Sequence, residues 1–303
     1  MFKRKKTLTG ERLYRKIVIN TILVIIAIVW TVPTLGLLVT SFRTPEAIHN
    51  SGWWTAFADL GSFSLDNYQA VIFGEYSDSA GNVVTASSIN ISTAFLNSLT
   101  VTIPAVIIPI LIAALAAYGI AWLRFPGRKF FFAAIIGCLV FPLQISLIPI
   151  LRDFQQLQIT GSYLAIWFAH TGFALPLATY LLFNFISTIP KSIIESGKLD
   201  GASHFTIFFR LIVPLSVPAL AAFAIFQFLW VWNDLLLALV FLSGTGGAME
   251  VLTQRLLNMV GQYGQDWQLL TAAAFISMIL PLIVFFTLQK FFIRGLVTGS
   301  VKE

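Results

Sequence analysis

The sequence predicts an all-α integral membrane protein with six transmembrane helices. Hydrophobic residues make up 57% of the 303 residues and charged residues only 11%, and the mean hydropathy is +0.85. Six apolar segments are long enough to cross a bilayer, and the basic residues gather at one set of their ends. Because such a composition leaves too little polar surface for a water-soluble domain, we expect lipid to be the solvent of this chain.

The six expected spans follow from segment length. A bilayer core of about 30 Å requires about 20 residues of helix, since each residue rises about 1.5 Å. The segments that meet this length are Ile17–Thr40, Leu99–Ala121, Phe130–Leu151, Tyr163–Phe183, Val217–Phe241 and Leu270–Gln289. Several contain proline, which breaks helices in water. In membranes, neighbouring helices and waters can satisfy the carbonyl groups that proline frees.

The basic residues predict the orientation. With both termini in the cytoplasm, 16 of the 19 basic residues lie inside, and only Arg43, Arg152 and Arg255 lie outside. The inside set is Lys3, Arg4, Lys5, Lys6, Arg12, Arg15, Lys16, Arg124, Arg128, Lys129, Lys191, Lys198, Arg210, Lys290, Arg294 and Lys302. This asymmetry is the positive-inside pattern. It also accounts for the net charge of +6 without nucleic acid as a partner.

Other classes of site lack the residues that they need. The single cysteine, Cys138, cannot form an internal disulfide or a thiolate metal cage. His49, His170 and His204 are scattered without metal-ligand spacing, so no metal site is expected. The basic start, Met1–Lys6, precedes an apolar run too long for a signal peptide, which favours a retained first helix.

We therefore expect one transmembrane domain over residues 1–303, with two large outside loops at 42–96 and 243–269. The first contains Trp53 and Trp54, residues typical of the membrane interface. A short cytoplasmic tail, 294–303, follows the sixth span. It contains Gly295 and Gly299, and we expect it not to fold alone.

The cytoplasmic loop at 187–214 is too polar to span the bilayer and too patterned for a plain linker. Pro190 is followed by Ser192 and, three residues later, Glu195, the form of a capping box that starts a short helix. Gly201 is expected to end that helix in a left-handed conformation, and a second helix would cover Ser203–Ile212. Three aromatic residues on its exposed side, Phe205, Phe208 and Phe209, require a partner surface or the underside of the bundle.

This loop resembles the signature of permease subunits of binding-protein-dependent ABC importers, which reads Glu-Ala-Ala, three residues, Gly, about nine residues, and Ile-x-Leu-Pro. Glu195, Gly201, Ile212 and Pro214 match, although the last spacing is one residue shorter and Ser196-Gly197 replaces the Ala-Ala pair. Further motifs resemble the carbohydrate-uptake branch, similar to the second maltose permease subunit. They are Asn97-Ser98, Phe125-Pro126-Gly127-Arg128, Trp232-Asn233-Asp234 and the Arg294–Lys302 tail, while Ser51-Gly52-Trp53-Trp54 is similar to α-glucoside permeases.

The resemblance implies a type I ABC importer fold in a bacterial inner membrane and a sugar or glycoside as substrate. Its implied partners are a homologous second permease, two copies of an ATPase subunit and an extracytoplasmic sugar-binding protein. This chain has no G-x-x-x-x-G-K motif, so ATP and magnesium would bind to the ATPase subunits. The implied ATPase-coupling residues are Glu195, Asp200, Gly201, Ala202, Phe205, Arg210 and Pro214. Gly261, Gln262 and Tyr263 would contact the binding protein, and the tail would reach the ATPase interface.

Two sets of residues have more than one interpretation. Gln144, Gln227 and Asn233 offer the amide groups that a sugar path requires, but hydrogen bonds between helices explain them equally well. Asp234 lies near the outer end of the fifth span, where a hydrated or interhelically paired carboxylate is expected. Glu195 is expected to cap its own helix, to contact the ATPase, or to do both.

Two other functions compete with import. An ion-coupled secondary transporter requires charged groups in mid-span, for which only Asp234 is a candidate. An intramembrane enzyme requires paired catalytic groups at membrane depth, and the sequence offers no Ser–His, His–Glu or carboxylate pair placed for that chemistry.

Overall fold

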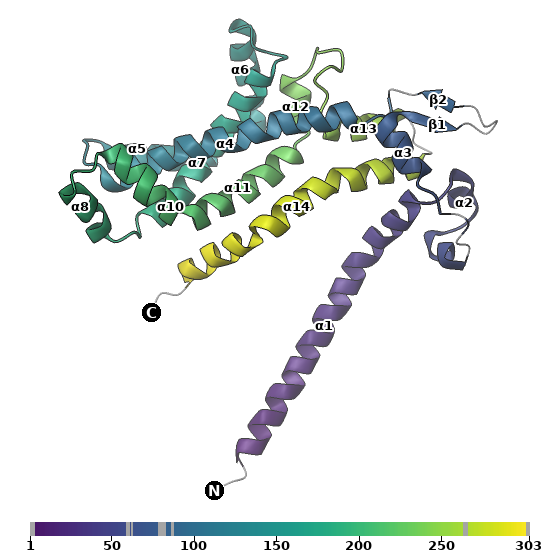
Figure 1. The fold of residues 1–303 in the computed structure, drawn as a ribbon, viewed down its shortest axis with the longest axis horizontal. Helices are drawn as coiled ribbons and strands as arrows, with labels where there is room; N and C mark the ends of the chain where they lie inside the picture. The colour runs from purple at the N-terminus through teal and green to yellow at the C-terminus, as the bar shows by residue number, and fades with distance from the viewer. Residues whose placement is uncertain are drawn as a thin grey trace. The chain divides into compact units, whose positions relative to one another are not determined.

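The computed structural model describes the whole chain except residues 1–3, 59–60, 62, 78–82, 86–87, 263–265 and 301–303. Helices dominate the described part, and two short strands are present that the all-α prediction did not include (Figure 1). The elements are α1 (Arg4–Ser41), α2 (Pro45–Asn50), η1 (Trp53–Ala58), α3 (Asp66–Phe73), β1 (Glu75–Ser77), β2 (Val83–Thr85), α4 (Ser92–Trp122), α5 (Arg128–Gly137), η3 (Cys138–Val140), α6 (Leu143–Gln156), α7 (Tyr163–Ile186), α8 (Lys191–Leu199), α9 (His204–Ile207), η4 (Phe208–Ile212), α10 (Val213–Leu215), α11 (Val217–Trp232), α12 (Leu236–Phe241), α13 (Leu252–Gln262) and α14 (Trp267–Ser300).

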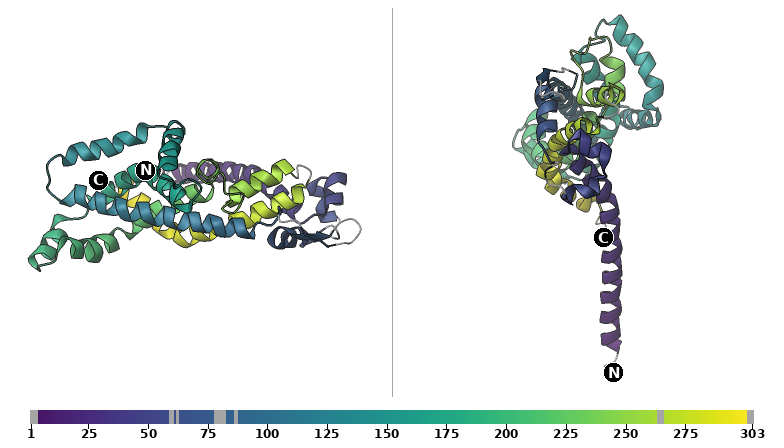
Figure 2. Two further views of the ribbon diagram at one scale, coloured as in Figure 1. Left: turned by 90° about the horizontal axis from the view of Figure 1, so that it is seen from above. Right: turned by 90° about the vertical axis from the view of Figure 1, so that its right-hand side faces the viewer.

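Four helical segments are long and apolar enough to cross a membrane unbroken: Leu13–Ser41, Ser92–Trp122, Tyr163–Ile186 and Trp267–Phe291. Two bent pairs pass the same test together, so the described residues contain between four spans and the predicted six, the larger number applying if each pair is one span. Arg128–Val140 and Leu143–Gln156 meet at 104°, and His204–Leu215 and Val217–Trp232 meet at 73°. Figure 2 shows the first of these bends from above.

Three of the predicted spans differ from the observed ones. The third is broken at Phe141–Pro142, where Pro142 takes an extended conformation. The fifth ends at Trp232 instead of Phe241, and the separate helix α12 follows. The helix of the sixth span continues to Ser300, so residues 294–300 of the predicted tail extend this helix.

The chain forms two compact units. The first contains residues 1–90 and 259–275, and the second contains residues 91–258 and 276–303. In the first unit, β1 and β2 pair antiparallel, with Tyr76 opposite Val84. Arg43 is buried there, and its guanidinium donates to the Ala47 carbonyl at 2.6 Å and to the Ser51 hydroxyl at 2.6 Å. Arg43 is one of the three basic residues that depart from the positive-inside pattern. Its buried hydrogen bonds give it a structural role that accounts for this position.

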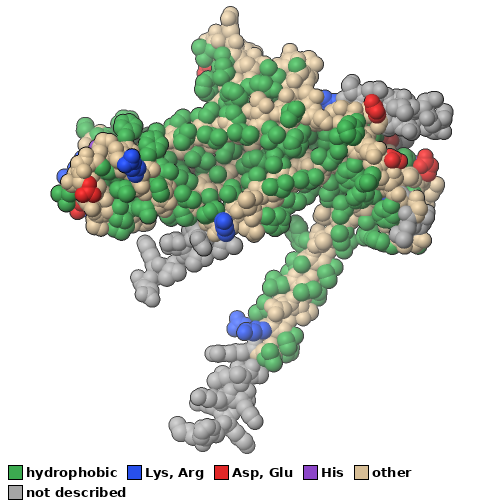
Figure 3. Space-filling model, viewed as in Figure 1, with side chains coloured by type: hydrophobic (Ala, Val, Ile, Leu, Met, Phe, Trp, Pro, Cys, Tyr) green, Lys and Arg blue, Asp and Glu red, His purple; other side chains and the backbone are tan. Residues whose placement is uncertain are grey.

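The core of the second unit is the contact between α4 and α7, which lie side by side in both views (Figures 1 and 2). Small side chains make the contact close: Ala113 and Ala117 on α4 and Ala178 on α7 are fully buried. Small residues allow helix backbones to approach within a membrane, where dispersion contacts replace the hydrophobic effect as the driving force. On the face that Figure 3 shows, the helices present a largely hydrophobic surface, and one group of charged side chains lies around α8.

The described helices of the second unit contain five internal prolines, Pro104, Pro109, Pro149, Pro176 and Pro281. For three of them, a side chain from another helix donates to the carbonyl group that the proline frees four residues earlier. Pro104 frees the Thr100 carbonyl, which accepts from Trp167 Nε1 at 3.0 Å. Pro109 frees the Ala105 carbonyl, which accepts from Gln227 Nε2 at 3.1 Å. Pro281 frees the Ser277 carbonyl, which accepts from Trp232 Nε1 at 3.0 Å. The expected compensation by neighbouring helices is therefore present as specific hydrogen bonds.

This arrangement predicts that Gln227→Leu destabilises the protein by about 1–3 kcal/mol, because the buried Ala105 carbonyl loses its donor. In a Pro109→Ala background residue 109 regains its amide hydrogen and can itself donate to Ala105. The cost of Gln227→Leu should then shrink in this double-mutant cycle, measured as thermal unfolding in detergent. Equal costs in both backgrounds would show that the amide does not act through the freed carbonyl.

Candidate functional site: the loop at 187–214 and the polar network before α13

The loop predicted at 187–214 begins with helix α8. Its N-cap is Pro190, which has no side chain to cap the helix, and Ser192 lies inside the first turn. The capping-box prediction was therefore wrong, although the helix itself is present. Glu195 is exposed in the middle of α8, with Ile194 and Gly197 buried beneath. The carboxylate of Glu195 thus lies at the surface and makes no capping hydrogen bond to α8.

The end of α8 is a Schellman motif. Gly201 N donates to the Lys198 carbonyl at 3.0 Å, and Ala202 N donates to the Gly197 carbonyl at 3.0 Å. This pattern requires a left-handed residue at the first position after the cap, and Gly201 has φ +76°. A Cβ at Gly201 would meet no atom within 4 Å, so only the backbone conformation demands glycine there. The predicted role of Gly201 as a turn former is confirmed.

The second part of the loop folds back onto α8. Ser203 caps α9 by accepting from Thr206 N at 3.2 Å, and a π-helical turn, η4, follows in place of the regular helix expected up to Ile212. Gly197 lies so close to this segment that a Cβ would sit 3.3 Å from Ile207 Cγ1 and 3.2 Å from Leu211 Cδ1. The replacement of alanine by glycine at 197 therefore permits close packing of the two short helices.

The loop shares the core of α4 and α7. Ile207, Phe208 and Ile212 are buried together with the alanines of that contact. Tyr118, near the end of α4, packs against the Phe208 ring at 5.5 Å between centroids, and its hydroxyl lies 2.9 Å from His204 Nδ1. Phe208 is thus a core residue that packs against the bundle, one of the two alternatives expected for the aromatic residues of this loop. Because these contacts are buried, the loop is a part of the bundle and not a flexible connection.

The face of the loop that points away from the bundle carries the predicted coupling residues. Glu195, Asp200, Gly201, Phe205, Arg210 and Pro214 are exposed, and Ala202 is half-buried. Phe205 is 71% exposed and Leu199 is 89% exposed, so two large apolar groups meet water in the isolated chain. Such groups at the tip of a polar loop indicate a surface that another protein covers.

The structure does not bring the three residues proposed for a sugar path together around one cleft. Gln227 is buried and donates to the Ala105 carbonyl, and Asn233 Nδ2 donates to Leu229 of its own helix at 2.7 Å. Gln144 is exposed on α6. A cleft of about 580 Å³ lies beside α6, α7 and α11, but none of these three residues lines it. Its walls are mainly apolar, with Phe168, Phe173 and Trp230 among them.

Asp234 lies between α11 and α12 and caps α12. Its Oδ2 accepts from Leu237 N at 3.0 Å and from Ala238 N at 3.2 Å, and it lies 3.8 Å from His170 Nε2. The backbone carbonyl of Asp234 accepts from Thr253 Oγ1 at 2.7 Å. The carboxylate therefore satisfies the start of a helix, and an interhelical partner lies next to it, as one of the sequence interpretations expected.

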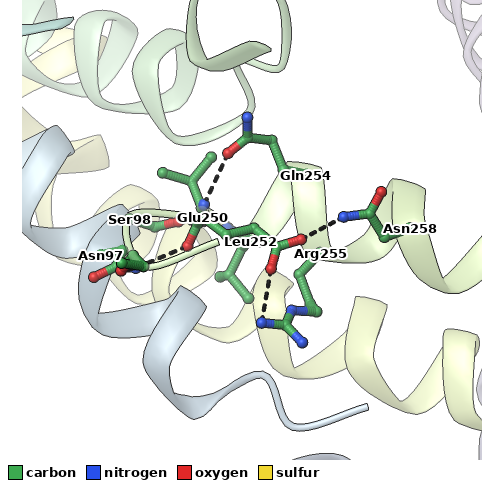
Figure 4. Close-up of polar contacts among 9 residues, drawn as sticks. Asn97, Ser98, Glu250, Leu252, Gln254, Arg255 and Asn258 are labelled. Carbon is green, nitrogen blue, oxygen red and sulfur yellow. Dashed lines mark hydrogen bonds and ion pairs between the residues drawn. The ribbon is translucent and has the colours of Figure 1, made fainter. Parts of the chain in front are cut away.

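A second polar network fixes the segment before α13 (Figure 4). Asn97 Nδ2 donates to the carbonyls of Ala248 at 3.0 Å and Glu250 at 2.9 Å, while Ser98 Oγ accepts from Leu252 N at 2.8 Å. Glu250 pairs with Arg255 at 2.7 Å, which explains a second basic residue outside the positive-inside pattern. The expected outer loop is thus an anchored turn followed by a helix.

The residues proposed for binding-protein contact lie at the end of that helix. Gly261 and Gln262 are the last residues of α13, so their backbone is helical and not part of an irregular loop. Tyr263 lies outside the described residues.

The chain matches a protein-family model over residues 7–298, described as the inner membrane component of binding-protein-dependent transport systems. This match spans nearly the entire sequence. The chain belongs to this family.

Relatives of this permease share most of its length. The osmoprotective compounds uptake permease protein GgtD of Synechocystis sp. is 50% identical, over 96% of this chain and 93% of the relative. The alpha-glucoside transport system permease protein AglG of Rhizobium meliloti is 40% identical, over 92% of this chain and 95% of the relative. A chain of the bacterial alginate ABC transporter crystal structure has the same fold, with TM-score 0.65 at 13% identity, covering 94% of this chain and 96% of that one.

Sequence reasoning missed two residues: Leu199 in the permease loop, and Tyr118 on α4, which contacts the loop. Leu199 escaped notice because the helical pattern of Ile193, Ile194 and Gly197 defines the buried face, and no signal separates an exposed leucine from a buried one at the helix end. Tyr118 lies 86 residues from His204, and only the folded chain brings them together.

For the permease loop we predict that Gly201→Val abolishes ATP-dependent uptake, whereas Gly201→Asn largely retains it. Valine in a left-handed conformation costs about 1–2 kcal/mol or more, while asparagine tolerates that conformation. Both variants should insert in the membrane in equal amounts, measured by immunoblot of membrane fractions beside uptake of labelled substrate. Equal uptake by the two variants would contradict a requirement for this turn.

For the outer bend of the permease we predict that Asp234→Ala lowers stability more than Asp234→Asn. The alanine variant leaves the Leu237 and Ala238 amides without an acceptor, at a cost of about 0.5–2 kcal/mol, while the asparagine oxygen can still accept. Thermal unfolding of the purified permease in detergent measures the difference. Identical melting temperatures would show that the cap contributes nothing.

Proposed function

We propose that this permease is one of two homologous membrane subunits of an ATP-driven importer for a sugar or a small glycoside. The observation that carries the proposal is the cytoplasmic helix–turn–helix, with an exposed polar and apolar tip and a base built into the α4–α7 core. The relatives named for osmoprotective compounds and α-glucosides support a neutral glycoside as the substrate class.

In this proposal the loop is the coupling element. Glu195, Asp200, Phe205 and Arg210, together with Leu199, contact a groove on an ATPase subunit. Two copies of that subunit bind ATP and magnesium and close on each other, while this chain binds neither. Because the base of the loop is buried against α4 and α7, a displacement of the loop moves these helices with it.

The two bent pairs are suited to such a movement. The bends of 104° before α6 and 73° before α11 interrupt the backbone ladder, so each half can turn without stretching a continuous helix. A sugar-binding protein would deliver the substrate on the opposite side, near the end of α13 at Gly261, Gln262 and Tyr263. The sugar would then pass between this chain and its homologous partner.

The three residues considered for a sugar path have a smaller role in this proposal than the loop. Asn233 and Gln144 are exposed and remain available to a hydroxyl group, while the Nε2 atom of Gln227 is already bonded to Ala105. We propose that Gln144 and Asn233 meet the substrate only when the partner subunit completes the path.

The test is assembly and transport. We expect the tagged permease to copurify with an ABC ATPase and a second permease, and the reconstituted complex to accumulate a labelled α-glucoside only with ATP and binding protein. Isolation of the chain as an active transporter driven by an ion gradient would overturn the proposal. Leu199→Ser and Phe205→Ser should reduce copurified ATPase without changing the copurified permease.

We also predict the orientation of the loop. In a Cys138→Ser background, Ala248→Cys should react with an impermeant maleimide added to intact spheroplasts, whereas Ser203→Cys should react only after permeabilisation. Both positions are exposed in the structure, so accessibility within the protein does not limit either reaction. The reverse labelling pattern would place the loop on the wrong side for an ATPase.

A further inference from the structure

Three basic residues between the second and third spans lack acidic partners. Arg124, Arg128 and Lys129 lie within six residues of one another, and the chain has no aspartate or glutamate from position 79 to 152. Among the described residues, no aspartate or glutamate forms an ion pair with any of these three cations. Arg128 makes only a long hydrogen bond, 3.3 Å from its Nη1 to the Leu123 carbonyl.

Two of these cations line a cleft. Arg128 and Lys129, at the start of α5, face the ends of α4 and α7 across a space of about 230 Å³. Its other walls are Ile120, Ala121, Phe132, Phe183 and Ser187, so the cleft is apolar on the side of the bundle and cationic at its rim. Phe132 and Phe183 pack together with their ring centroids 4.2 Å apart and close the apolar side.

The cleft lies at the depth of lipid headgroups. Helix α4 has 31 residues and is therefore about 46 Å long, which exceeds the bilayer core of about 30 Å. Its end at Trp122 consequently reaches the polar layer of the membrane. Phe130 and Phe131 are 72% and 55% exposed next to the cations, as residues in contact with lipid are.

We propose that this cleft binds an anionic phospholipid, with the phosphate between Arg128 and Lys129 and the glycerol backbone against Ile120, Phe132 and Phe183. The charge of the rim matches a phosphate, and basic pockets between transmembrane helices on the cytoplasmic side bind such headgroups. The apolar wall favours a lipid over a free anion, because inorganic phosphate has no apolar part to bury there.

The test is native mass spectrometry of the full-length permease in mild detergent, titrated with phosphatidylglycerol. In Arg128→Gln/Lys129→Gln we expect phosphatidylglycerol binding to weaken roughly tenfold or more, because two cations act on one phosphate. The matched control is Arg15→Gln/Lys16→Gln, another adjacent Arg-Lys pair, which lies on the exposed surface of α1. This control should bind as the natural protein does, and phosphatidylcholine should bind weakly to all three.

A second variant tests the cleft without altering charge. Ala121→Phe fills the space between α4 and α5 and should also weaken phosphatidylglycerol binding, even if the double glutamine variant folds poorly. If phosphatidylglycerol binding weakens equally in the two Arg-Lys double variants, the lipid is attracted to any pair of cations and not to this cleft. That result would overturn the proposal. Displacement of the lipid from the natural protein by millimolar inorganic phosphate, or unchanged binding in Ala121→Phe, would overturn it as well.

Discussion

The structure of the second unit depends on one constraint: a backbone carbonyl or amide that loses its helical partner within a membrane must find another. Lipid offers no hydrogen bonds, so each such group costs several kcal/mol if it is left unpaired. Trp167, Gln227 and Trp232 each donate to a carbonyl that a proline frees. Two of these donors belong to α11, so the prolines of α4 and α14 help to determine where α11 packs.

The same constraint explains the polar residues around the outer bend. Where α11 ends, Asp234 accepts from the first amides of α12, and where the chain leaves helix again, Asn97 donates to two carbonyls before α13. Tyr163 in turn donates to Asn97 Oδ1 at 2.8 Å and fixes the direction of its amide. Several polar side chains that the sequence alone would allow in a substrate path therefore serve as hydrogen-bond partners of backbone groups.

The attachment of the loop to the bundle rests on small side chains. The alanines of α4 and α7 permit a close contact, and the same core receives Phe208 and Ile212 from the loop. Gly197 allows α8 to rest on this segment, and Gly201 lets the chain reverse between the two helices. A larger residue at either glycine would alter the position of the exposed tip without touching it.

The sequence by itself determined the membrane class and the loop that carries Glu195 and Gly201, because apolar length and turn-forming residues are local properties. It also indicated that the prolines would need compensation. It could not determine which side chains compensate, since Gln227 and Ala105 are 122 residues apart in the chain. The break of the third span at Pro142 and the early end of the fifth at Trp232 are seen only in the structure. Tertiary packing also selects Phe208, and neither Phe205 nor Phe209, as the aromatic residue of the loop that is buried, because its ring packs against Tyr118 of α4.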